Sequence, residues 1–132
     1  MEKKKPRILI IEDDEYSREA TEHLLNAEGC ETKSAPGGIS GYRMARRFLP
    51  DIIVLDLNLP DIDGQRVLRK IRGNRVLGRV PIIVITGYGP NRIPAEVSAS
   101  ADFLITKPAS FDDVTRAIFD LLRGTAASRA IR

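Results

Sequence analysis

The chain has 132 residues, which suits a single domain, and 42% of them are hydrophobic, which is enough for a core and excludes a disordered segment. The formal net charge is only +3, with both signs spread along the chain, and this argues against nucleic-acid binding by this domain alone. The single cysteine, Cys30, excludes an internal disulfide, and no apolar run is long enough to span a membrane. We therefore expect a cytoplasmic protein that makes no membrane contact.

Five strand-sized apolar runs alternate with five helical patterns along the chain. Most of the runs are continuously apolar and rich in isoleucine and valine, which is typical of buried parallel strands. We expect strands over residues 7–12, 30–35, 51–56, 80–86 and 102–106. The run over 30–35 is the most polar of the five, so we place it at an exposed edge of the sheet.

Helical patterns occupy the intervals between the strands. Apolar residues spaced by three and four positions predict helices over 16–28, 38–48, 64–72, 94–99 and 111–123. Gly29 and Gly124 are the expected stops of the first and last helices. The chain then divides into a basic N-terminal segment (1–6), one domain (7–123) and a flexible tail (124–132). Alternating strands and helices predict an α/β fold with a parallel sheet covered on both faces.

Chemically useful side chains follow four of the five expected strands. Asp13 and Asp14 close the first run, Asp56 closes the third, Thr86 the fourth and Lys107 the fifth. In an open α/β sheet the ligand site lies outside the carboxyl ends of the strands, so these groups are expected to meet. Crowded carboxylates repel one another, and such a cluster invites a hard divalent cation. Mg²⁺ is the usual guest of a few carboxylates plus a phosphate.

These motifs, taken together and in this order, resemble the receiver domain of bacterial response regulators. The resemblance rests on the acid pair, on Asp56 with the following Leu-Asn-Leu-Pro-Asp-Ile-Asp-Gly, on Thr86 and on Lys107-Pro108. It covers about residues 7–123, nearly the whole chain. It implies a flavodoxin-like, doubly wound sheet of five parallel strands in the order 2-1-3-4-5 with five helices. The implied class is the single-domain, chemotaxis-type regulator of two-component systems.

The resemblance implies a phosphoacceptor and a metal site. Asp56 would accept a phosphoryl group from a histidine kinase or a phosphotransfer protein. Asp14 and Asp56 would ligate Mg²⁺ directly, Asp13 would act through water, and the backbone carbonyl of Asn58 would complete the protein's share of the shell.

The resemblance also implies which groups bind the phosphoryl group. Lys107 would pair with Asp56 at rest and with the phosphoryl group afterwards, and Thr86 would hydrogen-bond a phosphoryl oxygen. Gly87 would let its backbone N–H approach a phosphate oxygen, because no Cβ stands in the way. A cis peptide before Pro108 would point the lysine into the site.

Each of these residues also has an ordinary structural interpretation. Asp13 and Asp14 could cap the helix that follows them, because acids suit a helix N-terminus. Asp56 could lie in a solvated loop, and Lys107 could lie in a surface turn. His23 is expected to be a surface histidine and not a phosphoryl carrier.

The sequence departs from the common receiver pattern on the side that signals to partners. Leu104 stands three residues before the lysine, where many receivers carry a rotating tyrosine or phenylalanine, and Phe103 lies one residue earlier. Tyr88 lies two residues after the threonine, at the mouth of the site. We expect the signal to be carried by the loop and short helix over 87–99, with Tyr88 and Leu104 as the switch positions.

Three further interpretations stay open at this point. A haloacid-dehalogenase-type phosphatase also uses an aspartate nucleophile and Mg²⁺, but its first strand ends in Asp-x-Asp, unlike the adjacent Asp13-Asp14 here. A pseudo-receiver would act only as an interaction module, and the chain could be a receiver cut from a longer regulator. On the receiver interpretation the chain acts on no external substrate. It catalyses only its own phosphorylation and dephosphorylation, and it presents a switched surface to an unknown downstream protein.

Overall fold

The computed structural model describes the backbone of residues 4–131, and the side chains of Pro90 and of 125–131 lie outside the description. Five parallel strands form one sheet in the order β2-β1-β3-β4-β5, as the resemblance implied. The strands are β1 (Arg7–Ile11), β2 (Glu31–Ala35), β3 (Ile52–Asp56), β4 (Ile82–Thr86) and β5 (Phe103–Thr106). Strand β2 is the most polar of the five and lies at an edge, which confirms that prediction.

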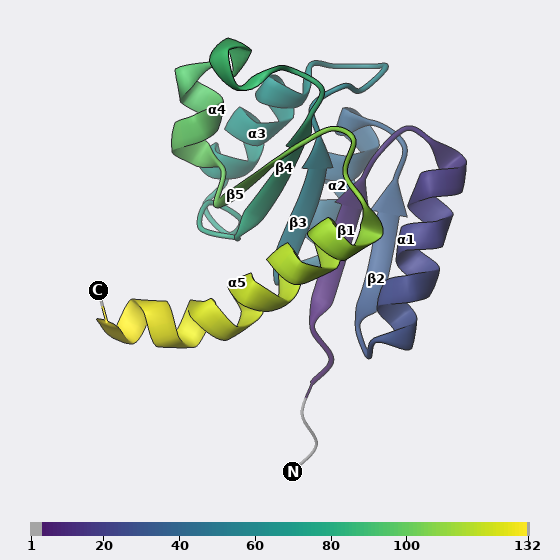
Figure 1. Ribbon diagram of the computed structural model, residues 1–132, viewed down its shortest axis with the longest axis vertical. Helices are drawn as coiled ribbons and strands as arrows, with labels where there is room; N and C mark the ends of the chain where they lie inside the picture. The colour runs from purple at the N-terminus through teal and green to yellow at the C-terminus, as the bar shows by residue number, and fades with distance from the viewer. Residues whose placement is uncertain (1–3, 132) are drawn as a thin grey trace.

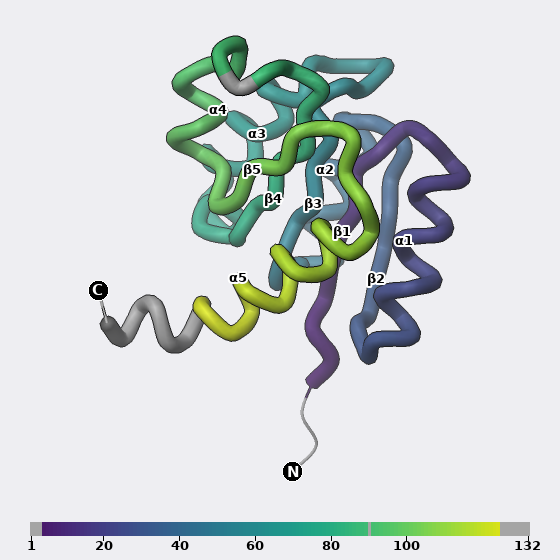
Figure 2. Tube along the Cα trace, viewed as in Figure 1, coloured from purple at the N-terminus to yellow at the C-terminus, as the bar shows by residue number. Residues whose placement is uncertain are grey.

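A helix follows each strand and returns the chain to the start of the next strand (Figure 2). The helices are α1 (Glu15–Ala27), α2 (Gly38–Phe48), α3 (Gly64–Gly73), α4 (Ala95–Ser100) and α5 (Phe111–Ile131), and a short 3-10 turn, η1 (Pro90–Arg92), precedes α4. The predicted strands and first four helices agree with these bounds to within two residues. In the described part of the chain, no helix is both apolar enough and long enough to cross a membrane.

The predicted end of the last helix at Gly124 is wrong. Helix α5 continues through this glycine to Ile131. A glycine inside a helix costs only about 1 kcal/mol relative to alanine. The residues that follow, Thr-Ala-Ala-Ser-Arg-Ala, include three alanines and no proline, so they favour continuing the helix. The flexible tail predicted for 124–132 falls almost wholly on residues whose side chains are not described, and it stays a prediction.

Helices cover both faces of the sheet (Figure 1), and a hydrophobic layer lies between the sheet and the helices on each face. On one face, α2, α3 and α4 pack against the sheet through Phe48, Leu68 and Val97. On the other face, α1 and α5 pack through Leu25 and Ile118. Successive residues of a strand point to opposite faces, so each strand contributes alternately to the two layers. This alternation decides which polar groups meet at the carboxyl ends of the strands.

The loop between β3 and α3 is held against the start of α2 by Asp61. Its two carboxylate oxygens accept hydrogen bonds from the backbone N–H groups of Gly38 (2.8 Å) and Ile39 (2.9 Å). These bonds to the amides of Ile39 and Gly38 favour the ionised form, so they lower the pKa of the Asp61 carboxyl. A carboxylate from a distant loop therefore supplies the cap of α2, whose own N-cap residue, Gly37, has no side chain.

We expect Asp61→Asn to lower the free energy of unfolding by about 1 kcal/mol at neutral pH, the usual cost of losing an N-terminal cap. A lowered pKa in the folded state contributes stability above the unfolded pKa, and this stability is lost as the pH falls through the folded pKa. The difference from the wild type should therefore shrink below about pH 4. Urea denaturation at several pH values measures it, with Asp120→Asn on α5 as the control. A difference independent of pH would contradict the charged cap.

Candidate functional site

Asp56 is the last residue of β3 and is almost fully buried, with 4% of its surface exposed. Both of its carboxylate oxygens have partners. Oδ1 accepts a hydrogen bond from the backbone N–H of Asn58 at 2.8 Å, and Oδ2 lies 2.8 Å from Nζ of Lys107. The solvated-loop interpretation of Asp56 is therefore wrong. A buried carboxylate held at both oxygens has a fixed position and orientation.

Lys107 and Thr86 reach the same place from neighbouring strands. The peptide between Lys107 and Pro108 is cis, as the resemblance implied. The backbone N–H of Lys107 donates to the carbonyl of Thr86 at 2.7 Å, which joins the ends of β4 and β5. Thr86 is fully buried, and its Oγ1 accepts a hydrogen bond from the backbone N–H of Tyr88 at 3.0 Å. Gly87 lies beside both groups, because a Cβ placed on it would be 3.4 Å from Nδ2 of Asn58 and 3.9 Å from Cδ of Lys107.

Glu12 is a residue of this site that the sequence analysis missed. In β1, Ile8 and Ile10 face the α1 and α5 layer, and two-residue alternation carries Glu12 onto the same face. In β3 the same alternation carries Asp56 onto that face, after Ile52 and Val54. The strands pair in the register Ile11 with Leu55, so one residue further on Glu12 stands opposite Asp56. Counting in twos along the first run was the signal that could have identified it.

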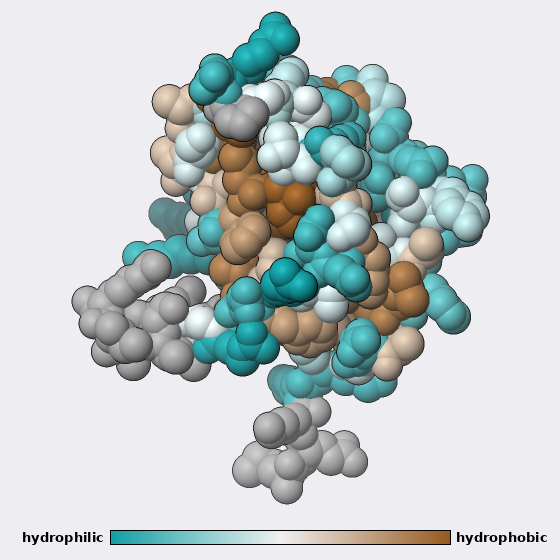
Figure 3. All heavy atoms as spheres, in the orientation of Figure 1, coloured by the Kyte–Doolittle hydropathy of each residue, from teal (hydrophilic) through white to brown (hydrophobic). Residues whose placement is uncertain are grey.

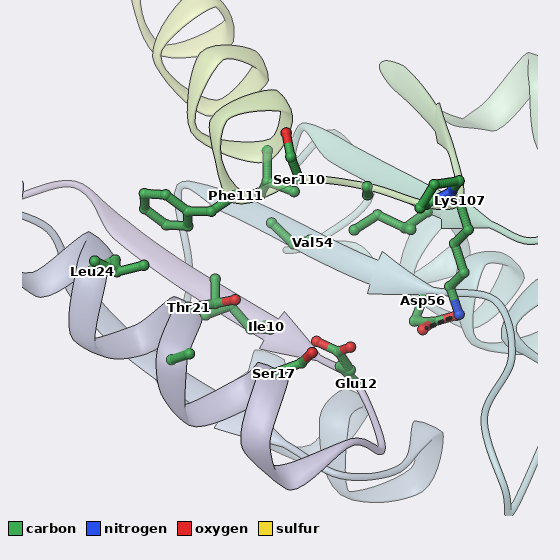
Figure 4. A pocket seen from close by; sticks show the side chains of 15 residues that line it. Ile10, Glu12, Ser17, Thr21, Leu24, Val54, Asp56, Lys107, Ser110 and Phe111 are labelled. Atoms are coloured by element: carbon green, nitrogen blue, oxygen red, sulfur yellow. Dashed lines mark ion pairs between the residues drawn. The ribbon is translucent and has the colours of Figure 1, made fainter.

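The side chain of Glu12 lines an open pocket together with Asp56 and Lys107 (Figure 4). Burial raises the pKa of the Glu12 carboxyl, and the negative charge of Asp56 raises it further, with smaller contributions from Asp14 and Asp13. Lys107 is the one positive charge that acts on Glu12, and it lowers the pKa of this carboxyl. The site thus holds more negative charge than its lysine compensates, which is the electrostatic condition that favours a bound cation.

Asp14 has the structural role that the sequence had left open. It is the N-cap of α1, and its Oδ2 accepts a hydrogen bond from the backbone N–H of Ser17 at 3.1 Å. Asp13 is exposed, and its carbonyl accepts a hydrogen bond from Arg18 at 3.3 Å. Within residues 4–131, no three carboxylate, imidazole or thiol side chains are placed so as to form a complete metal site. The sequence predicted that Asp14 ligates Mg²⁺ directly. This role stays a prediction, and the hydrogen bond by which Asp14 caps α1 does not favour it.

Residues 8–119 match the model of the response regulator receiver domain. The chain belongs to this family. The receiver's curated relatives include the transcriptional regulator RpaA of Synechocystis, 34% identical over 91% of the chain, and the response regulator PleD of Caulobacter vibrioides, 40% identical over 82% of the chain. The chain spans about half the length of RpaA and about a quarter of PleD. The family assignment excludes the dehalogenase-type phosphatase fold.

Solved receiver domains share the architecture. A CheY-like receiver domain protein from Methanospirillum hungatei superposes with a TM-score of 0.85 at 27% identity, and the match covers 95% of this chain and 99% of that one. The response regulator TrrA from Thermotoga maritima, solved in complex with Mg²⁺ and BeF, superposes with a TM-score of 0.77 at 28% identity, covering 88% and 98% of the two chains. These similarities confirm the flavodoxin-like fold expected from the sequence.

Apolar side chains surround the receiver's polar site on one side. The pocket that reaches Asp56 has a volume of about 700 Å³ and lies between α1 and the loop that leads into α5. Its walls include Leu24, Ile85 and Phe111. Figure 3 shows apolar side chains gathered in the middle of this face of the molecule. A molecule that approaches Asp56 therefore meets an apolar surface beside the charged groups.

Proposed function

We propose that this receiver domain accepts a phosphoryl group on Asp56 from a phosphohistidine of a histidine kinase or phosphotransfer protein and then switches a partner-binding surface. The observation that carries the proposal is the buried carboxylate of Asp56, held by the Asn58 amide and the Lys107 ammonium beside Glu12. A carboxylate is a competent covalent acceptor in phosphoryl transfer. A cytoplasmic location and bacterial two-component signalling belong to the same proposal.

In the transfer step, an oxygen of Asp56 forms the bond to phosphorus while the P–N bond of the donor phosphohistidine breaks and the imidazole leaves. The chain supplies positioning and positive charge, which carry most of the catalysis of phosphoryl transfer. Lys107 neutralises Asp56 before transfer and pairs with the phosphoryl oxygens after it. The hydroxyl of Thr86 then donates to a phosphoryl oxygen, and the N–H of Gly87 binds another.

Glu12, Asp13 and Asp56 are the carboxylates that we propose for the Mg²⁺ site, together with the carbonyl of Asn58. Carboxylate and carbonyl oxygens are the donors that Mg²⁺ prefers, and this ion keeps several waters, so an incomplete protein shell fits it. Burial raises the pKa of the Glu12 carboxyl most, and the neighbouring charge of Asp56 raises it further; a bound cation would compensate that charge. When bound, the ion would neutralise charge on the phosphoryl oxygens during transfer. In this set of ligands Glu12 takes the place of Asp14, because the carboxylate of Asp14 caps α1.

Alanine variants of the two neighbouring aspartates should behave in opposite ways. Asp14→Ala should lower the free energy of unfolding by about 1 kcal/mol, because it removes the cap of α1, and should leave Mg²⁺ binding intact. Asp13→Ala should lose no stability without Mg²⁺, or gain some, because it relieves repulsion, and should lose the stabilisation that Mg²⁺ provides. Thermal melts with and without Mg²⁺ measure both effects. If Asp14→Ala alone abolished the Mg²⁺ effect, the original ligand assignment would stand.

The structure suggests a route from the phosphoryl group to the partner surface. Oγ1 of Thr86 accepts the N–H of Tyr88, so a threonine that turns toward a phosphoryl group releases the start of the β4–α4 segment. Leu104 packs partly buried against the core and is too short to change the surface much by rotating. Tyr88 is 43% exposed and is the aromatic residue that lies within this segment. We therefore assign the switch to residues 87–99, with Tyr88 in place of an aromatic at 104.

Amide hydrogen exchange should change most over residues 87–99 when the protein is loaded with Mg²⁺ and beryllofluoride. This segment contains the turn η1 and the six-residue helix α4, so we expect it to be the least stable part of the domain. The comparison is between free and loaded wild-type protein, with Asp56→Asn treated identically as the control. A response confined to α1 or α3 would contradict this switch and leave the phosphorylation site unaffected.

The experiment that tests the proposed function is intact-mass spectrometry after incubation with acetyl phosphate and Mg²⁺. We expect a gain of a single phosphoryl group per chain. Turnover of many equivalents of a phosphate ester per chain would contradict the proposal. The chain spans about half of RpaA and about a quarter of PleD, so the proposal names no downstream partner from these relatives.

A further inference from the structure

The face of the molecule formed by α2 and α3 carries an unusual concentration of positive charge. Six exposed cations lie on these two helices, and we call them the basic face: Arg43, Arg46, Arg47, Arg66, Arg69 and Lys70. Neither helix contains an acidic residue. Because the net charge of the whole chain is only +3, the rest of the chain is net negative. The fold therefore brings two arginine-rich stretches of the sequence, 43–47 and 66–70, onto one face of the molecule.

Each helix carries its three cations with the same spacing. Positions 43, 46 and 47 of α2, and 66, 69 and 70 of α3, are related by three and four residues, so each set lies on one side of its helix. Tyr42 joins the two sets, because Arg46 lies 5.3 Å and Lys70 5.2 Å from its ring centroid. Its hydroxyl also accepts a hydrogen bond from Asn74 at 3.1 Å, which fixes the ring. The two sets therefore form one continuous surface.

Fold stability explains only part of this arrangement. Like charges at these spacings destabilise a helix by about 0.2–0.5 kcal/mol per pair. Cations favour the last turn of a helix, which accounts for Arg46, Arg47 and Lys70. Arg66 lies in the first turn of α3, where a cation is unfavourable. Among the described residues, only Arg69 of the six forms an ion pair, with Glu96 at 2.6 Å.

We propose that the basic face binds the phosphate backbone of nucleic acid, without reading its sequence. Arginine and lysine clustered on one face are the electrostatic footprint of backbone binding. The composition of the basic face favours nucleic acid over an acidic protein as the ligand. Protein interfaces have an apolar centre, and their charged residues lie at the rim. Here the charges occupy the centre. Ile39, at the start of α2, is the only strongly exposed large apolar side chain that the described structure places on either helix.

This inference goes beyond the proposed function and reverses the expectation from the sequence that this domain alone does not bind nucleic acid. That expectation rested on charges mixed along the chain, whereas binding depends on charges gathered in space. The basic face lies on the layer of α2, α3 and α4, whereas the walls of the phosphorylation pocket come from the opposite layer of α1 and α5. The two sites can therefore be altered separately.

The test measures the fluorescence anisotropy of a short labelled DNA duplex of arbitrary sequence titrated with the full chain. A triple variant, Arg43→Gln, Arg46→Gln and Arg47→Gln, is compared with a control of identical net charge, Lys5→Gln, Lys33→Gln and Arg116→Gln, whose sites are exposed elsewhere. At about 50 mM salt the α2 variant should lose tenfold or more in affinity. The slope of log affinity against log salt should become shallower by roughly 2 to 3. The control should stay close to the wild type.

Three outcomes would overturn the proposal. Equal losses in both triple variants would show an effect of net charge alone. Absence of duplex binding by the wild type at about 50 mM salt would show that the face does not bind nucleic acid. Competition by poly-glutamate as strong as by unlabelled duplex of equal charge would assign the face to an acidic protein partner. Phosphorylation of Asp56 from acetyl phosphate, measured in each variant, verifies that all variants are folded.

Discussion

Replacing Asp56 by asparagine is expected to abolish phosphorylation while leaving the fold in place. The amide keeps the size of the side chain and its contact with the Asn58 backbone N–H, but it removes the anionic oxygen that attacks phosphorus. Loss of the negative charge also leaves the Lys107 ammonium without its partner and removes a repulsion from Glu12. Intact-mass spectrometry after incubation with acetyl phosphate and Mg²⁺ should show no added mass in this variant.

The matched control is Asp120→Asn, the same chemical change at an exposed aspartate on α5 that pairs with Arg123. This variant should be labelled at the wild-type rate, because an exposed ion pair contributes little to the fold and Asp120 is remote from the site. Labelling of Asp56→Asn at the wild-type rate would place the phosphoryl group on another residue. Peptide mapping of the labelled protein would then identify it.

The largest effect on stability is expected for Gly64→Ala. Gly64 begins α3, and its N–H donates to the carbonyl of Leu57 at 3.1 Å. A Cβ at this position would lie 2.4 Å from the Cα and 2.6 Å from the carbonyl oxygen of Leu57. Backbone atoms cannot rotate away as a side chain can, so the loop between β3 and α3 has to move. Forced overpacking of this kind typically costs about 1–3 kcal/mol and occasionally more.

Gly73→Ala provides the control for this prediction. Gly73 is the last residue of the same helix, and a Cβ there would meet nothing within 4 Å. This variant should be neutral or gain up to about 1 kcal/mol, since alanine is the better helix former. Urea denaturation with unchanged slope would report the difference in stability. If Gly64→Ala were as stable as Gly73→Ala, the close approach of α3 to Leu57 would not be a constraint on the loop that holds Asp56.

The fold and the centre of the site follow largely from the local sequence. Continuous runs of isoleucine and valine predict buried parallel strands, and a polar residue at the end of such a run must lie at the carboxyl edge of the sheet. Asp56, Thr86 and Lys107 are such residues, and the structure brings all three together. The predicted end of α5 at Gly124 was wrong, because a glycine ends a helix only when the following residues also disfavour helix.

The acidic side of the site and the basic face depend on the tertiary structure. Four consecutive acids, Glu12 to Glu15, follow the first apolar run, and local sequence does not distinguish them. The pleat of β1 and its register with β3 turn Glu12 toward Asp56, whereas the start of α1 uses Asp14 as its cap. The basic face arises because α2 and α3, which are separated by a strand in the chain, pack side by side. Sequence alone determined which residues end the strands, and long-range packing decided which of them face one another, because electrostatic interactions depend on distance in space.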